Sequence, residues 1–342
     1  MLVRRSAVWP QTSLACAWLL LALALSPQQA SAEEPSRSVR LSSAAELLPK
    51  STVAFAVAPD LGSIADMILE HPLRSEVERL PVFDQFMQSD PVVQFKAGLS
   101  LFEAGMGKRW PSVLKAITQG GVFVAIDGET DGIALLAKTE SPEVIKQLRD
   151  TVFPAIRAGK TPGSEDDPIK TGEYRGVTAY AFGDEVKMAA LGSWLLLTNK
   201  SETGKEIVDL YADAQSETLE PGLFNSLADS QVFSQATKLQ EGDSSLWGYF
   251  DIAAIRASGA AEYLYSGRTD NPLAELLFGG IAANLKHTPL ASFAMELGTD
   301  SISATVRTPH DNSWIGEDRA YYFGADGQAK APEPVSYTHL TL

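Results

Sequence analysis

The stretch GGVFVAIDGETDGIALLA, residues 120–137, contains the clearest β-hairpin signal in the chain. Its two arms, residues 122–126 and 133–137, are almost continuously apolar, and a polar turn that contains two glycines joins them. A strand with one solvated face alternates apolar and polar residues, so these arms predict central strands that are covered on both faces. Gly120 and Gly121 predict the end of a preceding helix over residues 112–118.

Upstream of this hairpin, the pattern predicts a strand followed by helices. Residues 52–58 form a β-prone apolar run. The apolar positions after residue 60 then repeat at helical spacing, with Asp60 as the candidate N-cap. A second helical pattern covers residues 92–106.

Downstream of the hairpin, helices and a second meander are predicted. Residues 141–143 read Ser-Pro-Glu, which is typical of a helix start. Residues 173–182 and 186–198 predict a meander, and a further helix follows from residue 201. Ser226 and Asp229 have the spacing of a capping box at the start of another helix.

The pattern then restarts. Residues 246–252 predict a strand that reaches Asp251 and continues into a helix over residues 253–265, and residues 293–306 predict another hairpin. Asp251 occupies the position that Asp60 has in the first unit; helix capping explains both, and a paired acid site is the alternative. We therefore predict an α+β fold, a degenerate repeat of strand–helix–hairpin units that form mainly antiparallel sheets with helices packed on them. The first unit spans residues 44–240 and the second, shorter and truncated, residues 241–330.

The N-terminus has the features of a secretory signal. Arg4 and Arg5 precede an apolar run of about twelve residues, and Ala-Ser-Ala at positions 30–32 fits a cleavage site between Ala32 and Glu33. The run is short for a membrane anchor, which needs about 20 residues. Residues 1–32 are thus expected to direct the protein to the periplasm, outer envelope or exterior, with residues 33–43 as a linker.

Composition excludes several classes of partner. The chain of 342 residues carries 28 Lys and Arg against 43 Asp and Glu, a net charge of −15. Nucleic-acid binders concentrate basic residues, so DNA and RNA are not expected partners. The only cysteine, Cys16, lies in the leader, so the mature chain offers no disulfide or thiolate metal site. No segment after the leader is apolar enough to span a membrane.

The last residues of the chain are not expected to belong to the fold. Residues 335–342, VSYTHLTL, resemble the translation of a sequencing adapter. We expect residues 331–342 to be a tail, and the natural protein to continue beyond it.

Three features resemble a group of exported bacterial proteins whose shared domain has no assigned function. These are the Leu47-Leu48-Pro49 lead-in to the first strand, the Gly120-Gly121 pair before the hairpin, and a strand that ends in Thr198-Asn199 before a helix. The resemblance covers about residues 44–255. It implies an exported α+β protein of two units and brings no catalytic residue.

The sequence gives only weak indications of catalysis, cofactor binding or metal binding. The sequence contains no nucleophile elbow, P-loop or dinucleotide fingerprint, and no cofactor is expected. Asp127, Glu129 and Asp131 alternate in the hairpin turn and are weak candidates for Ca²⁺ ligands, but the loop is too short for an EF-hand. A solvated hairpin tip is the simpler interpretation.

Three functions remain open from sequence. The leading hypothesis is an exported, non-enzymatic interaction module. The second is a glycan- or ligand-binding module that uses the late aromatic residues Trp314, Tyr321 and Tyr322. The third is a hydrolase with an unrecognised site built from an acid and a histidine.

Overall fold

The computed structural model describes residues 44–70, 78–79, 83, 86–158, 167–215, 225–240, 242–265, 279–281, 283–298 and 301–314. The predicted cleavage site at Ala32 and Glu33, the linker and the tail lie outside the described residues, as do Tyr321 and Tyr322.

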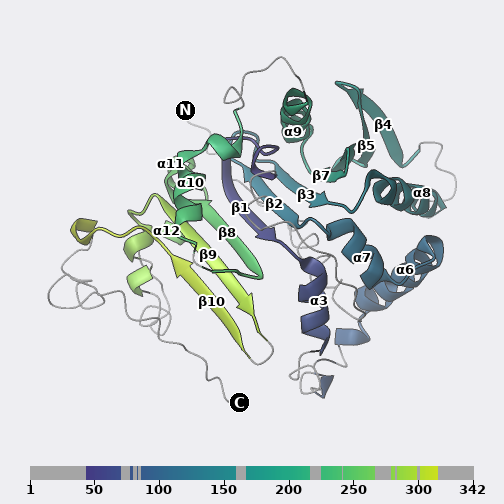
Figure 1. The fold of residues 1–342 in the computed structure, drawn as a ribbon, viewed down its shortest axis with the longest axis horizontal. Coiled ribbons are helices and arrows are strands. Elements are labelled where there is room, and N and C mark those ends of the chain that lie inside the picture. Colours follow the sequence, from purple (N-terminus) through teal and green to yellow (C-terminus); the bar gives the residue numbers. More distant parts are fainter. Residues whose placement is uncertain are drawn as a thin grey trace, which may run out of the picture.

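The described strands form one ten-stranded sheet in which each neighbouring pair is antiparallel (Figure 1). In chain order they are β1 (Thr52–Ala58), β2 (Val122–Asp127), β3 (Ile133–Lys138), β4 (Ile169–Tyr174), β5 (Val177–Phe182), β6 (Val186–Leu191), β7 (Trp194–Thr198), β8 (Leu246–Asp251), β9 (Leu290–Leu297) and β10 (Ile302–Arg307). Their order across the sheet is β10-β9-β8-β1-β2-β3-β7-β6-β5-β4.

Helices lie on both faces of this sheet. They are α3 (Leu61–Glu70), α6 (Asp90–Met106), α7 (Trp110–Thr118), α8 (Pro142–Ala158), α9 (Ser201–Ala214), α10 (Gln231–Lys238), α11 (Ile252–Ser258) and α12 (Glu262–Tyr265), with 3-10 turns η1 (Leu227–Asp229) and η2 (Asn312–Trp314). In Figure 1, α3, α6, α7 and α8 are grouped together, whereas α10 lies against β8 and β9. The predicted α+β class is confirmed.

The two predicted units meet inside the sheet. β1 pairs with β8, so β1-β2-β3 extend to one side of this pair and β8-β9-β10 to the other. Each first strand runs into a helix capped by the predicted aspartate: Asp60 accepts a hydrogen bond from the Ser63 amide, and Asp251 accepts one from the Ala254 amide, both at 2.8 Å. The strand–helix–hairpin repeat is therefore visible in topology and capping, and both copies share one sheet.

The main core also spans both units. On the face covered by α9 and α10, aromatic side chains from β1, β2, β8 and α10 pack against one another, with ring centroids about 5.6 to 6.4 Å apart. Trp247 and Tyr249 are fully buried there. The Trp247 indole donates to the Ser292 hydroxyl (3.1 Å), and the Tyr249 hydroxyl donates to the Thr52 carbonyl (3.1 Å). A second cluster lies under α8 on the opposite face.

Some predicted elements differ from the structure. The helix predicted over residues 253–265 is broken because Gly259 adopts the left-handed conformation (φ 72°) and ends α11. The box of Ser226 and Asp229 closes the 3-10 turn η1, and α10 starts anew with the Ser230 hydroxyl as its cap. The second meander contains four strands, because a two-residue turn at Arg175 and Gly176 separates β4 from β5 and another at Gly192 and Ser193 separates β6 from β7.

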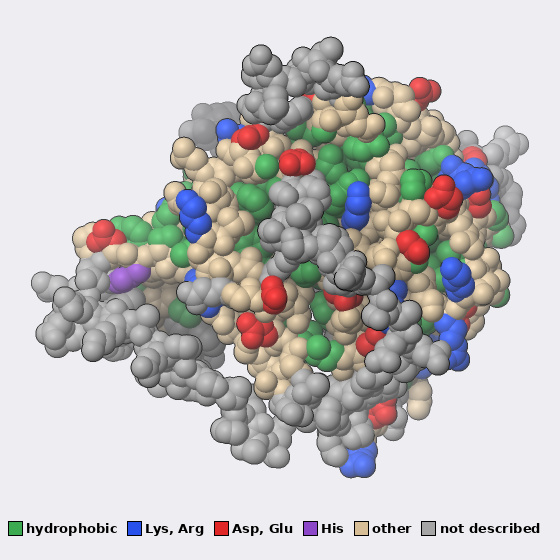
Figure 2. Space-filling model, viewed as in Figure 1, with side chains coloured by type: hydrophobic (Ala, Val, Ile, Leu, Met, Phe, Trp, Pro, Cys, Tyr) green, Lys and Arg blue, Asp and Glu red, His purple; other side chains and the backbone are tan. Residues whose placement is uncertain are grey.

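Acidic and basic side chains are interspersed on the face shown in Figure 2. Among the described helices, none has the length and apolar character that crossing a membrane requires.

Candidate functional site

The sheet opens between β5 and β6. Their pairing runs from Phe182 opposite Val186 to Ala179 opposite Ala189 and stops there. Beyond this point β5 pairs only with β4, and β6 pairs only with β7. Continuing the register would place Thr178 opposite Ala190. The alternation of an antiparallel ladder aims the backbone amide and carbonyl groups of these two residues into the gap.

The turns of the two hairpins that flank the opening, β4–β5 and β6–β7, are held by different parts of the molecule. At the turn between β4 and β5, Arg175 forms ion pairs with Asp209 (3.0 Å) and Asp213 (2.8 Å) of α9, and the Tyr174 hydroxyl donates to Asp209 (3.0 Å). At the turn between β6 and β7, the Ser193 carbonyl accepts from the Thr139 hydroxyl (2.8 Å) and amide (2.9 Å). These contacts keep the strands apart, so the opening is built into the fold.

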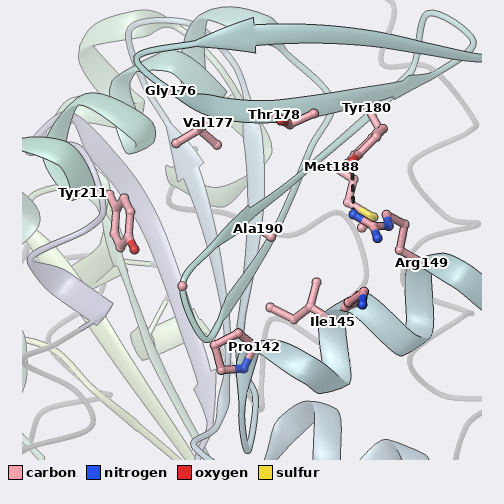
Figure 3. Close-up of a pocket in the computed structure, with 12 residues that line it drawn as sticks. Pro142, Ile145, Arg149, Gly176, Val177, Thr178, Tyr180, Met188, Ala190 and Tyr211 are labelled. Carbon is pink, nitrogen blue, oxygen red and sulfur yellow. Dashed lines mark hydrogen bonds between the residues drawn. The ribbon is translucent and has the colours of Figure 1, made fainter.

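A cleft of about 410 Å³ fills this opening, within the range of about 300–1,000 Å³ that is typical of ligand sites. We call it the β5–β6 cleft. Figure 3 shows Val177 and Thr178 on one strand, Ala190 on the diverging strand, and Pro142 and Ile145 approaching from α8. The other lining residues are Lys146, Arg149, Gly176, Tyr180, Met188, Gly192 and Tyr211.

The charged groups of the cleft lining are cations, in a protein with an excess of acids. Lys146 and Arg149 contribute them, and no aspartate or glutamate is among the lining residues. Arg149 bonds with Asp150 outside the cleft (2.8 Å) and approaches the Tyr180 hydroxyl (3.4 Å). These hydrogen bonds, the one with Asp150 foremost, raise the pKa of Arg149, so it stays a cation. Buried Ile145 and Met188 supply an apolar wall.

The sequence did not indicate this cleft. Apart from Pro142 in the helix start at residues 141–143, none of its lining residues belongs to a motif singled out from the sequence, and the site depends on where a strand ladder stops. One signal was present: Asp209 and Asp213 are four residues apart on a predicted helix, where they can both meet the Arg175 turn.

The structure gives Asp127 a role in the turn. Its buried carboxylate accepts hydrogen bonds from the Ser51 hydroxyl (2.5 Å), the Thr130 amide (2.9 Å) and the Thr130 hydroxyl. Glu129 and Asp131 occupy the same turn, Asp131 with a positive φ of 55°. Within the described part of the chain, no three His, Cys, Asp or Glu side chains gather as metal ligands would. The Ca²⁺ hypothesis thus gains no support and stays a prediction.

Glu206 lies near this turn, and the pKa of its carboxyl is raised by burial first and then by Asp127, Glu129 and Asp209. A raised folded-state pKa means that ionisation costs stability above that pKa and that the cost vanishes below the unfolded value. Glu206→Gln should therefore raise the melting temperature at pH 7. The gain in free energy of unfolding should be less than about 1 kcal/mol, because the group is partly exposed, and no gain is expected near pH 4. Thermal unfolding at both pH values checks this prediction.

Glu202→Gln is the matched control on the same helix. Glu202 is an exposed acid in the first turn of α9, where a negative charge favours the helix. This change should not stabilise the protein at pH 7. Equal gains from both variants would contradict the prediction.

The late aromatic residues are only partly described. Trp314 is half-buried and stacks on His287, with ring centroids 6.5 Å apart. His310 lies against the Asn284 side chain, with Nδ1 3.0 Å from Oδ1. Trp314 does not line the β5–β6 cleft, and Tyr321 and Tyr322 lie outside the described residues. The glycan hypothesis stays untested.

Comparisons with known proteins give little. No family model matches the sequence, and no curated protein matches it. Among solved structures, TP0453 in crystal form III is similar with a TM-score of 0.40 and 9% identity, over 81% of this chain and 84% of that one. Crystal form I of TP0453 gives a TM-score of 0.38 and 10% identity, over 81% and 82%. Similarity this low supports no inference about function.

Proposed function

We propose that the protein is exported and acts as a non-enzymatic binding protein, whose β5–β6 cleft takes a short extended peptide segment by strand addition. Export is supported by the signal pattern of residues 1–32. Binding is supported by the opening in the sheet, which is the observation that carries the proposal.

Two strand edges face the same cleft. Thr178 on β5 and Ala190 on β6 each aim an amide and a carbonyl group toward it, and both lie just beyond the last paired residues, Ala179 and Ala189. Extended peptides bind such edges through main-chain hydrogen bonds, while pockets select alternate side chains. Because both hairpin tips are tethered, the site loses little entropy on binding.

The side chains of the cleft set the preferred peptide. Ile145 and Met188 favour an apolar residue, and Arg149 with Lys146 favours a carboxylate nearby. We therefore expect a segment that combines apolar side chains with an acidic residue or the peptide's own C-terminal carboxylate. The hydrolase hypothesis requires an acid and a histidine in one site, and the lining of this cleft includes no aspartate, glutamate or histidine.

A binding titration tests this proposal. The probe is a fluorescein-labelled peptide of alternating valine and threonine that ends in glutamate. Wild-type protein should raise its anisotropy saturably, and Arg149→Gln should weaken binding about tenfold, which corresponds to about 1.4 kcal/mol. The control Arg157→Gln removes a cation from the same helix that pairs with Asp167 away from the cleft, and should bind as wild type.

A backbone control separates strand addition from simple charge attraction. The same peptide with N-methylated amides keeps its side chains and charge but loses donors that strand pairing requires. It should not bind measurably. Equal binding of both peptides, or equal weakening by the two arginine variants, would refute the proposal.

A further inference from the structure

The two outer edges of the sheet differ in character. β4 has charged, exposed side chains at Lys170 and Glu173 and a glycine between them, which discourages further strand pairing. β10 has no charge from residue 302 to residue 306, and Ile302 and Val306 are 57% and 53% exposed. Natural proteins seldom leave a β-prone, uncharged edge of this kind uncovered.

The outer edge of β10 has the geometry of a strand acceptor. Ser303 and Thr305 direct their backbone groups to β9, because Gly298 and Ser301 close the hairpin turn with a hydrogen bond (2.8 Å) and the ladder alternates from there. Ile302, Ala304 and Val306 therefore direct theirs outward. Among the described residues, no strand pairs with this edge.

The repeat shows that the equivalent edge accepts a strand. β3 is the third strand of the first unit, as β10 is of the second. The outer edge of β3 pairs antiparallel with β7 over residues 134–138.

We propose that β10 pairs antiparallel with β10 of a second copy of this chain, centred on Ala304, and so forms a two-fold symmetric dimer with one continuous sheet. In this register Ile302 lies opposite the partner's Val306, and Ser303 opposite the partner's Thr305. Aliphatic pairs and Ser–Thr pairs are both favourable across strands, and no like charges meet from residue 302 to residue 306. A sequence that complements itself about one residue is what a two-fold interface requires.

The sheet face beside β10 extends the contact. Val306 is opposite Phe293 on β9, and Phe293 stacks on Phe250 of β8, whose side chain is 37% exposed. Pairing across the two-fold axis would join these apolar rows from both copies.

Sedimentation of the full chain tests the proposal. We expect a reversible dimer with a dissociation constant on the order of 10 μM, as for small interfaces. Ala304→Pro removes an outward amide without touching the β9 ladder, and Val306→Lys places a charge on the edge. Both should remain monomeric at concentrations where wild type is dimeric.

Thr171→Pro is the matched control, because it removes an outward amide from the other edge strand, β4. It should dimerise as wild type. A monomeric wild-type protein would overturn the proposal, as would a dimer that survives both Ala304→Pro and Val306→Lys. The chain's own C-terminal residues could occupy the edge instead. The protein would then be a monomer whose amides at residues 302, 304 and 306 are protected from exchange, and this outcome would also overturn the proposal.

Discussion

Replacing Trp247 with alanine is expected to lower the free energy of unfolding by about 3–5 kcal/mol, the range for large-to-small changes of buried aromatic residues. Trp247 is fully buried and packs against Phe55 of β1 (5.9 Å between ring centroids) and Phe233 of α10 (6.2 Å). Its removal opens a cavity where the two units meet and leaves the buried Ser292 hydroxyl without its donor. Chemical denaturation measures the loss.

Trp247→Phe is the control, because it keeps much of the ring volume and should lose less stability. The shared sheet and core also predict that both units unfold together. A loss below about 1 kcal/mol, or separate unfolding steps for the two units, would contradict this description of the core.

The second large effect is expected at the hairpin turn. Asp127→Ala should lower the free energy of unfolding by about 2–3 kcal/mol, because Ser51 and Thr130 lose a charged acceptor in a site that is only 2% exposed. Thermal or chemical unfolding measures it. Asp127→Asn keeps one acceptor oxygen and should fall between wild type and alanine.

The same variant separates the turn role from the Ca²⁺ hypothesis. If the carboxylate serves the turn, millimolar Ca²⁺ should leave the melting temperature of wild type unchanged, because its oxygens already accept protein donors. A Ca²⁺-dependent rise that Asp127→Ala abolishes would favour a metal site instead.

Local features of the fold could be predicted from sequence. The apolar arms of β2 and β3, the caps Asp60 and Asp251, and the repeat of strand, helix and hairpin all follow from short-range patterns. These signals depend on residues close in the chain. The structure confirms them with boundary changes of a few residues.

Long-range features could not be predicted. The pairing of β1 with β8 joins residues that are almost 200 positions apart, and no local pattern specifies it. The β5–β6 cleft depends on the residue at which a ladder ends, which follows from the tethers at Arg175 and Ser193. The candidate residues chosen from sequence were acids and late aromatics, whereas the cleft is lined by backbone edges, aliphatic side chains, two cations and two tyrosines from other parts of the chain.

The most direct test of the proposed function is amide hydrogen exchange at Thr178 and Ala190, measured by NMR with and without the valine–threonine–glutamate peptide. Strand addition predicts that both amides become more protected in the complex than in the free protein, because each then donates to the peptide. Ala181, which already faces β4, serves as an internal control with unchanged protection. Unchanged exchange at Thr178 and Ala190 under saturating peptide would contradict the account.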